Sequence, residues 1–233
     1  MSRTLITTTA TLASLALLGA LASPVLAATP AEPATTQHAQ PQQQSQQQRQ
    51  TAQQHFLAAV DGDTARIEPA AEHYTALSAA DAADPVLRAY AGAATTMRAN
   101  TTWLPWRKMK FAEDGLAQLD KALAQLGPAQ ESAAAPGAVP AALEVRYVAA
   151  GTFLALPGMF NRGTRGEQLL AQVLAAPAQA QAPAAFQATV WLYAGRHAAK
   201  AGRKDEARQW LQRAAGSGVQ QQASAARQTL QGL

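Results

Sequence analysis

The chain has 233 residues and a formal net charge of +4, which is too small to indicate a nucleic-acid partner. It contains no cysteine, which excludes disulfide bonds, thiolate metal sites, cysteine nucleophiles and a lipid anchor on an N-terminal cysteine. Hydrophobic residues make up 48% of the sequence but aromatic residues only 6%, and this alanine-rich composition favours closely packed helices over a β-sandwich.

The first 27 residues have the three parts of a secretory signal peptide. Arg3 supplies the positive charge, residues 5–21 form an apolar and threonine-rich core, and Val25-Leu26-Ala27 places small residues before a cleavage site at Ala28. An uncleaved membrane anchor is the alternative, but the apolar core is short and diluted by threonine. We therefore expect an exported protein of the bacterial periplasm, with no membrane span after the leader is removed.

Residues 28–44 form a linker of alanine, proline, threonine and glutamine. We expect it to be disordered, because it cannot bury enough apolar surface to offset the entropy of ordering. The glutamine-rich sequence that follows becomes compatible with a helix, and its end is expected to turn Phe56, Leu57 and Val60 toward a core. Residues 45–233 are expected to form one helical domain.

Further helices are expected in the rest of the chain, because apolar residues recur there at helical spacing between turn residues. One begins near Pro69, and others cover residues 85–100, 107–126, 141–156, 165–175 and, as a terminal cap with a polar outer face, 219–230. Residues 130–140 and 176–183 are expected to be loops, because both are rich in alanine and proline.

The clearest pattern is a pair of amphipathic helices within residues 191–215, which meet at Gly202. In the second helix, Ala207, Leu211 and Ala214 share one face at the i, i+4, i+7 spacing of a buried stripe. The pattern predicts two helices packed against each other as a hairpin.

This stretch resembles a tetratricopeptide repeat, the 34-residue helix–turn–helix unit. Trp191 stands at the first large position of the repeat, Gly195 at its close-packing glycine and Ala207 where the two helices cross. Ala194 and Ala198 depart from the pattern, because they replace a large residue and a tyrosine. Residues 56–175 also resemble exported bacterial tetratricopeptide-like proteins, and this resemblance implies no particular activity.

Small residues recur at the expected helix crossings, although farther apart than 34 residues, which indicates insertions at the loops. The resemblance therefore implies an all-α fold, a right-handed array of antiparallel helical hairpins with a C-terminal capping helix. The positions expected to pack the repeats together are Ala70, Tyr74, Gly92, Gly115, Leu119, Gly166, Trp191, Gly195, Ala207, Leu211 and Ala214.

Residues that could carry catalysis or bind a metal form no recognisable constellation. The histidines at positions 38, 55, 73 and 197 never share a helix at metal-binding spacing, and no nucleophile motif or Walker lysine is present. Asp61, Asp63 and Glu72 match three ligand positions of a calcium loop, but the required glycine is missing, so Asp63 is expected to cap a helix instead. We therefore expect no enzymatic activity, metal or cofactor.

Two clusters are candidates for binding a partner. Trp103 and Trp106 lie beside Arg107, Lys108 and Lys110, and such a cluster could stack on a sugar, meet a lipid interface or grip a peptide. We favour the simpler interpretation that both indoles fill a gap between two helices.

The second cluster is the basic sequence of the last hairpin. The resemblance implies that Thr189, Leu192, Arg196 and Lys200 line a concave groove, which would suit an acidic peptide. A solvated helix surface is the simpler interpretation, and we favour it. The candidate partner-binding residues are therefore Thr189, Leu192, Arg196, Lys200, Trp103, Trp106 and Arg107.

These observations lead to the expectation of a non-enzymatic exported adaptor that binds a protein or peptide, possibly an acidic one. The alternative is an envelope carbohydrate-binding protein that uses Trp103 and Trp106. A catalytic helical domain is a third class, which the absence of an acid–base pair disfavours.

Overall fold

The computed structural model describes residues 39–132, 135 and 138–233, and those from Gln40 onward form one compact unit. Every regular element in this part of the chain is helical. The α-helices are α1 (Ala39–Val60), α2 (Ile67–Ala80), α3 (Pro85–Met97), α4 (Pro105–Ala124), α5 (Ala141–Ala155), α6 (Gly163–Ala175), α7 (Pro177–Gln181), α8 (Ala184–Lys200), α9 (Lys204–Ala215) and α10 (Gln220–Gln231). Short 3₁₀ turns lie between some of them.

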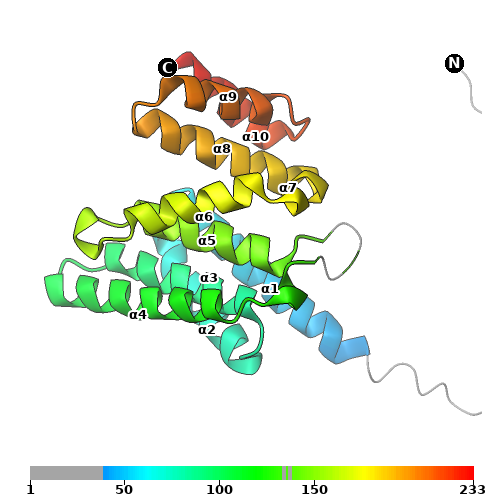
Figure 1. Cartoon of the computed structure of the whole chain (residues 1–233). Helices are drawn as coiled ribbons and strands as arrows, with labels where there is room; N and C mark the ends of the chain where they lie inside the picture. Colours follow the sequence, from blue (N-terminus) through cyan, green and yellow to red (C-terminus); the bar gives the residue numbers. More distant parts are fainter. Residues whose placement is uncertain (1–38, 133–134, 136–137) are drawn as a thin grey trace, which may run out of the picture. The chain divides into compact units, whose positions relative to one another are not determined.

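Three pairs of consecutive helices pack closely, namely α3 with α4, α5 with α6 and α8 with α9. Figure 1 shows these pairs following one another in chain order, with α10 beside α8 and α9. The expectation of an all-α fold in which helices pack against their neighbours is confirmed. None of the helices in the described ranges has both the length and the apolar character that crossing a bilayer requires.

Local sequence explains where the helices begin and end. Asp84 caps α3, because its side chain accepts hydrogen bonds from the backbone N–H groups of Val86 at 2.8 Å and Leu87 at 3.2 Å. Gly202 ends α8 in the left-handed conformation with φ of +76°, and the N–H of Arg203 donates to the carbonyl of Ala198 at 2.9 Å. This is the glycine-terminated helix end that lets α9 begin directly afterward.

Some boundaries differ from those expected. Helix α1 begins at Ala39, inside the stretch assigned to the linker, because glutamine and alanine are good helix formers and Pro41 falls in the first turn. For the same reason Pro69 is tolerated inside the first turn of α2. Helix α7 forms within the expected loop 176–183. The predicted leader, residues 1–27, and most of the linker lie outside the described residues.

The closest helix contacts depend on glycine. A Cβ on Gly115 would lie 2.8 Å from the backbone nitrogen of Thr96 and 2.5 Å from the carbonyl oxygen of Gly92, so α3 and α4 touch through their backbones. A Cβ on Gly195 would lie 2.6 Å from Cγ of Leu211, which makes the equivalent contact between α8 and α9. A Cβ on Gly166 would meet Leu154 of α5.

The core consists mainly of small side chains, and more than half of its buried hydrophobic residues are alanines. The largest cluster joins α1 through α6, and it also includes Ala194 of α8. A second cluster is formed by Ala198, Ala207, Leu211, Ala214 and Ala226 of α8, α9 and α10. A third cluster packs Val190 of α8 against Leu143 of α5 and Val173 of α6. Helix α8 therefore shares buried apolar contacts with both parts of the chain.

A buried polar network lies in the larger cluster. The phenol of Tyr90 donates to Glu144 at 2.8 Å, and that of Tyr74 donates to Gln53 at 2.6 Å, while the two rings stack with centroids 4.9 Å apart. Burial raises the pKa of Tyr90, which keeps its hydroxyl a donor. Burial also raises the pKa of Glu144, outweighing the hydrogen bond from Tyr90. The network links α1, α2, α3 and α5.

Candidate functional site

Helix α8 turns two cations to the solvent. Ala188, Ala194, Gly195 and Ala198 are buried, whereas Arg196 and Lys200 are exposed and stand four residues apart, so they share a face. Neither makes an ion pair or hydrogen bond with another described residue. This face is the part of the expected groove that remains accessible.

The other two predicted groove residues are partly covered. Gln222 of α10 donates to the hydroxyl of Thr189 at 3.3 Å, and this hydroxyl donates to the carbonyl of Ala185 at 2.8 Å. Leu192 packs against the cluster shared by α8, α9 and α10. Helix α10 therefore partly covers Thr189 and Leu192, whereas Arg196 and Lys200 remain exposed to solvent.

Three other basic side chains of this hairpin have hydrogen-bonding partners. Arg203 contacts Glu206 at 2.6 Å and Glu167 of α6 at 3.5 Å, and Arg208 contacts Asp205 at 2.9 Å. Lys204 donates to the carbonyl of Leu233 at 2.9 Å. These residues hold the turn and the chain end, which distinguishes them from Arg196 and Lys200.

Trp103 and Trp106 do not fill a gap between helices, so the favoured interpretation is wrong. Trp103 is 82% exposed and Trp106 is 67% exposed. Arg107 and Lys108 beside them are exposed and make no ion pair with any described carboxylate, whereas Lys110 pairs with Asp114 at 2.8 Å.

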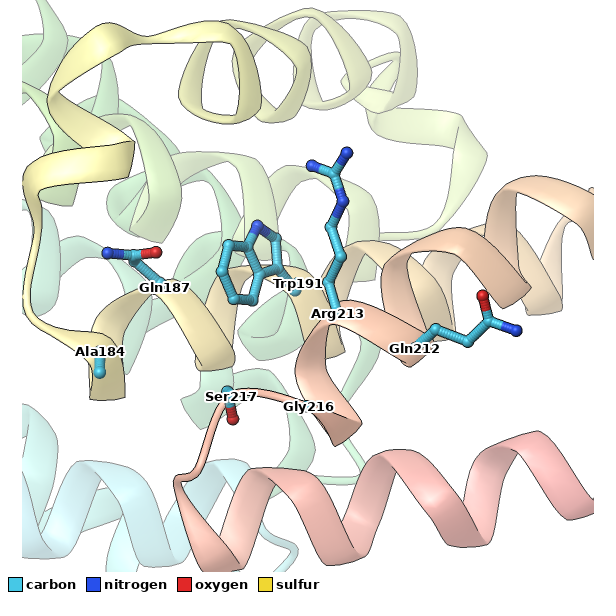
Figure 2. Close-up of a pocket in the computed structure, with 7 residues that line it drawn as sticks. All are labelled: Ala184, Gln187, Trp191, Gln212, Arg213, Gly216 and Ser217. Atoms are coloured by element: carbon cyan, nitrogen blue, oxygen red, sulfur yellow. The ribbon is translucent and has the colours of Figure 1, made fainter.

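A pocket of about 350 Å³ opens between α8 and α9, on the side of Trp191. Its lining comes from α8 and α9 and from the turn after α9, with Ala184, Gln187, Trp191, Gln212, Arg213 and Ser217 among the contributors. Figure 2 shows the indole of Trp191 between Gln187 and Arg213. The guanidinium of Arg213 lies 4.8 Å from the ring centre of Trp210.

Sequence reasoning missed this pocket. Trp191 was assigned to helix packing alone, and it does pack against the second core cluster while also lining the pocket. Gln187 and Gln212 belong to different helices, so no local motif joins them. The available sequence signal for the pocket was the pair Trp210 and Arg213, because residues three apart on a helix can bring an indole and a guanidinium into contact.

A second pocket of about 350 Å³ lies among α4, α5 and α6. It contains two arginines, but Arg146 pairs with Glu131 at 2.6 Å and Arg165 pairs with Asp120 at 2.6 Å. Because both charges are already matched, this pocket is the weaker candidate for binding an anion.

The other candidate chemistry has structural explanations. The side chain of Asp63 accepts from the N–H of Ala65 at 3.1 Å, so its predicted capping role is confirmed, on the short turn before α2. His55 and His73 stack with centroids 5.4 Å apart. Across the described residues, no three potential ligands gather in a way that could hold a metal ion.

Comparison with known proteins adds no relative: no protein-family model, curated protein or solved structure matches the chain.

Proposed function

We propose that the chain is an exported, non-enzymatic adaptor of the tetratricopeptide-like kind, which binds an acidic segment of a protein or peptide through α8. Three consecutive helical pairs and a terminal helix support a right-handed hairpin array, because neighbouring pairs contact one another in chain order. The glycine contacts at Gly92, Gly115, Gly166 and Gly195 support the same arrangement. The adaptor acts in the periplasm.

The observation that carries the proposal is the pair Arg196 and Lys200. Most arginines of the described chain bond to a carboxylate, an amide or a backbone carbonyl, whereas these two side chains are exposed and unmatched. Two cations on one helix face complement a carboxylate-rich strip, and they supply specificity and a fast encounter.

The test is photo-crosslinking from Ala199, a partly exposed neighbour whose replacement by a photoreactive residue keeps both cations, followed by binding measurements with the isolated partner. Arg196→Ala with Lys200→Ala is expected to weaken partner binding at least tenfold, about 1.4 kcal/mol, and to leave the melting temperature unchanged because both side chains are exposed. Raising the salt concentration is expected to weaken binding by the parent chain more than by the variant.

The matched control is Arg107→Ala with Lys108→Ala, which removes the same charge from another exposed site. Arg203 and Lys204 are unsuitable controls, because both make structural contacts. Equal losses in both double variants, or no loss in either, would contradict a site on α8.

A second candidate function, envelope carbohydrate binding, is favoured by the exposure of both Trp103 and Trp106. Exposed indole faces are costly to leave in water and suit the apolar face of a sugar ring. Trp103→Ala with Trp106→Ala is expected to abolish co-sedimentation with insoluble envelope polysaccharide. Unchanged co-sedimentation would remove this candidate.

A further inference from the structure

We propose that the pocket between α8 and α9 binds a sugar residue that carries a carboxylate. This site differs from the exposed face of Arg196 and Lys200 and from Trp103 and Trp106. It therefore does not depend on the proposed adaptor function, and each can fail alone.

The indole of Trp191 provides a surface for the sugar ring. It is half-buried, so one part of it packs against the second core cluster while another part lines the pocket. The face of an aromatic ring carries partial negative charge and attracts the C–H groups on the apolar face of a pyranose. The core contacts fix the ring, so little side-chain entropy is lost on binding.

Arg213 provides the charge. Its guanidinium is stacked on Trp210, which orients the group, and no described carboxylate pairs with it. The acidic residues of α9, Asp205 and Glu206, are bonded to Arg208 and Arg203 near the opposite end of the helix. The N–H edge of Arg213 therefore remains available for a bidentate bond with a ligand carboxylate.

One amide supplies a hydroxyl-binding group. Gln187 donates through Nε2 to the carbonyls of Ala180 at 3.2 Å and Ala182 at 2.7 Å, which leaves its Oε1 free to accept from a sugar hydroxyl. The amide of Gln212 points away from Trp191, so it is not assigned to the ligand (Figure 2). Ser217 is occupied, because it donates to the carbonyl of Ala214 at 2.7 Å.

The size and polarity of the pocket favour a sugar over a peptide side chain. A volume of about 350 Å³ is near the lower end of ordinary ligand pockets, which suits a single ring. An aromatic or aliphatic side chain would cover Trp191 but make no use of the polar groups of Gln187 and Arg213. An acidic pyranose has an apolar face, a rim of hydroxyls and one carboxylate, which match these groups.

The test uses the full chain labelled with ¹⁵N and the indole N–H signals of its four tryptophans, each assigned by single substitution to phenylalanine. Titration with D-glucuronate is expected to shift the Trp191 and Trp210 signals and to leave those of Trp103 and Trp106 in place. D-glucose and acetate, which each lack half of the proposed ligand, are expected to bind at least tenfold more weakly. Arg213→Gln is expected to lower glucuronate affinity at least tenfold.

The control is Arg208→Gln, which removes an exposed arginine of the same helix outside the pocket and is expected to leave glucuronate binding unchanged. Preserved signals elsewhere in the spectrum establish that Arg213→Gln is folded. The proposal is overturned if glucuronate leaves the Trp191 signal unmoved, if Arg213→Gln binds as the parent does, or if acetate or glucose binds as well as glucuronate.

Discussion

At the scale of single residues, the close contact between α3 and α4 requires that Gly115 has no side chain. A methyl group on Gly115 would press against the backbone of both Gly92 and Thr96, which cannot turn away as a flexible side chain could. We expect Gly115→Ala to lower the free energy of unfolding by about 1–3 kcal/mol, despite the higher helix propensity of alanine. Thermal or urea unfolding measures this difference.

The matched control is Gly151→Ala, because a Cβ there lies 3.8 Å from the ring of Tyr193, an ordinary contact distance. Gly151 is also inside a helix, so this variant is expected to gain about 0.5–1 kcal/mol from alanine's helix propensity. Destabilisation of equal size in both variants would show that steric contact at Gly115 is not the cause.

The buried carboxyl of Glu144 should make stability depend on pH. Its pKa in the folded chain is raised by burial, so folding is favoured while the carboxyl is protonated, and stability falls as the pH rises through the raised pKa. We expect Glu144→Gln, which still accepts from Tyr90, to be more stable than the parent at pH 7. The difference should shrink as the pH falls and vanish well below pH 4.5, the ordinary pKa of a glutamate, where the carboxyl is protonated in the unfolded chain too.

Denaturant unfolding of both chains across this pH range measures the effect, and other titrating groups cancel in the comparison. A larger difference at acid pH than at neutral pH would contradict the assignment.

The sequence patterns predicted which small residues lie at close helix contacts better than they predicted which large apolar residues are exposed. Ala207, Leu211 and Ala214 are buried as their spacing predicted, because helical periodicity fixes which residues share a face. Gly195, whose place came from the resemblance to the repeat, lies against Leu211. In contrast, Leu57 and Val60 were expected to point inward but are 50% and 59% exposed. Whether an apolar side chain is covered depends on which element packs over it, and this is not a local property of the sequence.

At the scale of elements, α10 covers the last hairpin with two buried alanines, Ala223 and Ala226. Ala226 is fully buried in the cluster that α8, α9 and α10 share. Ala226→Glu would bury a charge with no partner there, so we expect α10 to detach at a cost of about 2–5 kcal/mol. Hydrogen exchange measures the detachment as a loss of amide protection in residues 220–231.

Ser224→Glu is the control for helix propensity and charge, since position 224 is on the exposed side of α10. Its effect should stay within about 0.5 kcal/mol. If both variants lose protection equally, packing of Ala226 does not hold the helix in place.

Element positions were easier to predict than their ends. The segments of α4, α6, α9 and α10 were located to within about two residues, because each has an apolar stripe. Helix α5 is apolar on most of its surface, and it was located by the prolines on either side, Pro140 and Pro157. Helix α7 and the first turns of α1 lacked such a stripe, and composition alone suggested a loop or a linker. The pocket beside Trp191 was not predictable, because its groups converge only when α8 packs on α9.

At the scale of the whole described unit, the last three helices should open separately. Only α8 among them shares buried apolar side chains with the earlier helices, through Val190 and Ala194. Few polar contacts join the three helices to the rest, chiefly the bond from Tyr193 to the carbonyl of Gly151 at 3.2 Å and the contacts of His197 and Arg203 with Glu167. We expect native-state hydrogen exchange to give α8–α10 a lower opening free energy than α3–α5. Uniform protection across both regions would indicate one cooperative unit.

The alanine-rich core has a consequence for how this sequence can change over generations. Replacing a buried alanine with glycine removes only one methyl group, whereas each added methylene at a close helix crossing must displace a neighbouring atom. These positions therefore tolerate glycine, at a modest cost in helix propensity, but do not tolerate larger residues. Variation can accumulate in the loops and on the outer helix faces, while the spacing between the helices stays fixed.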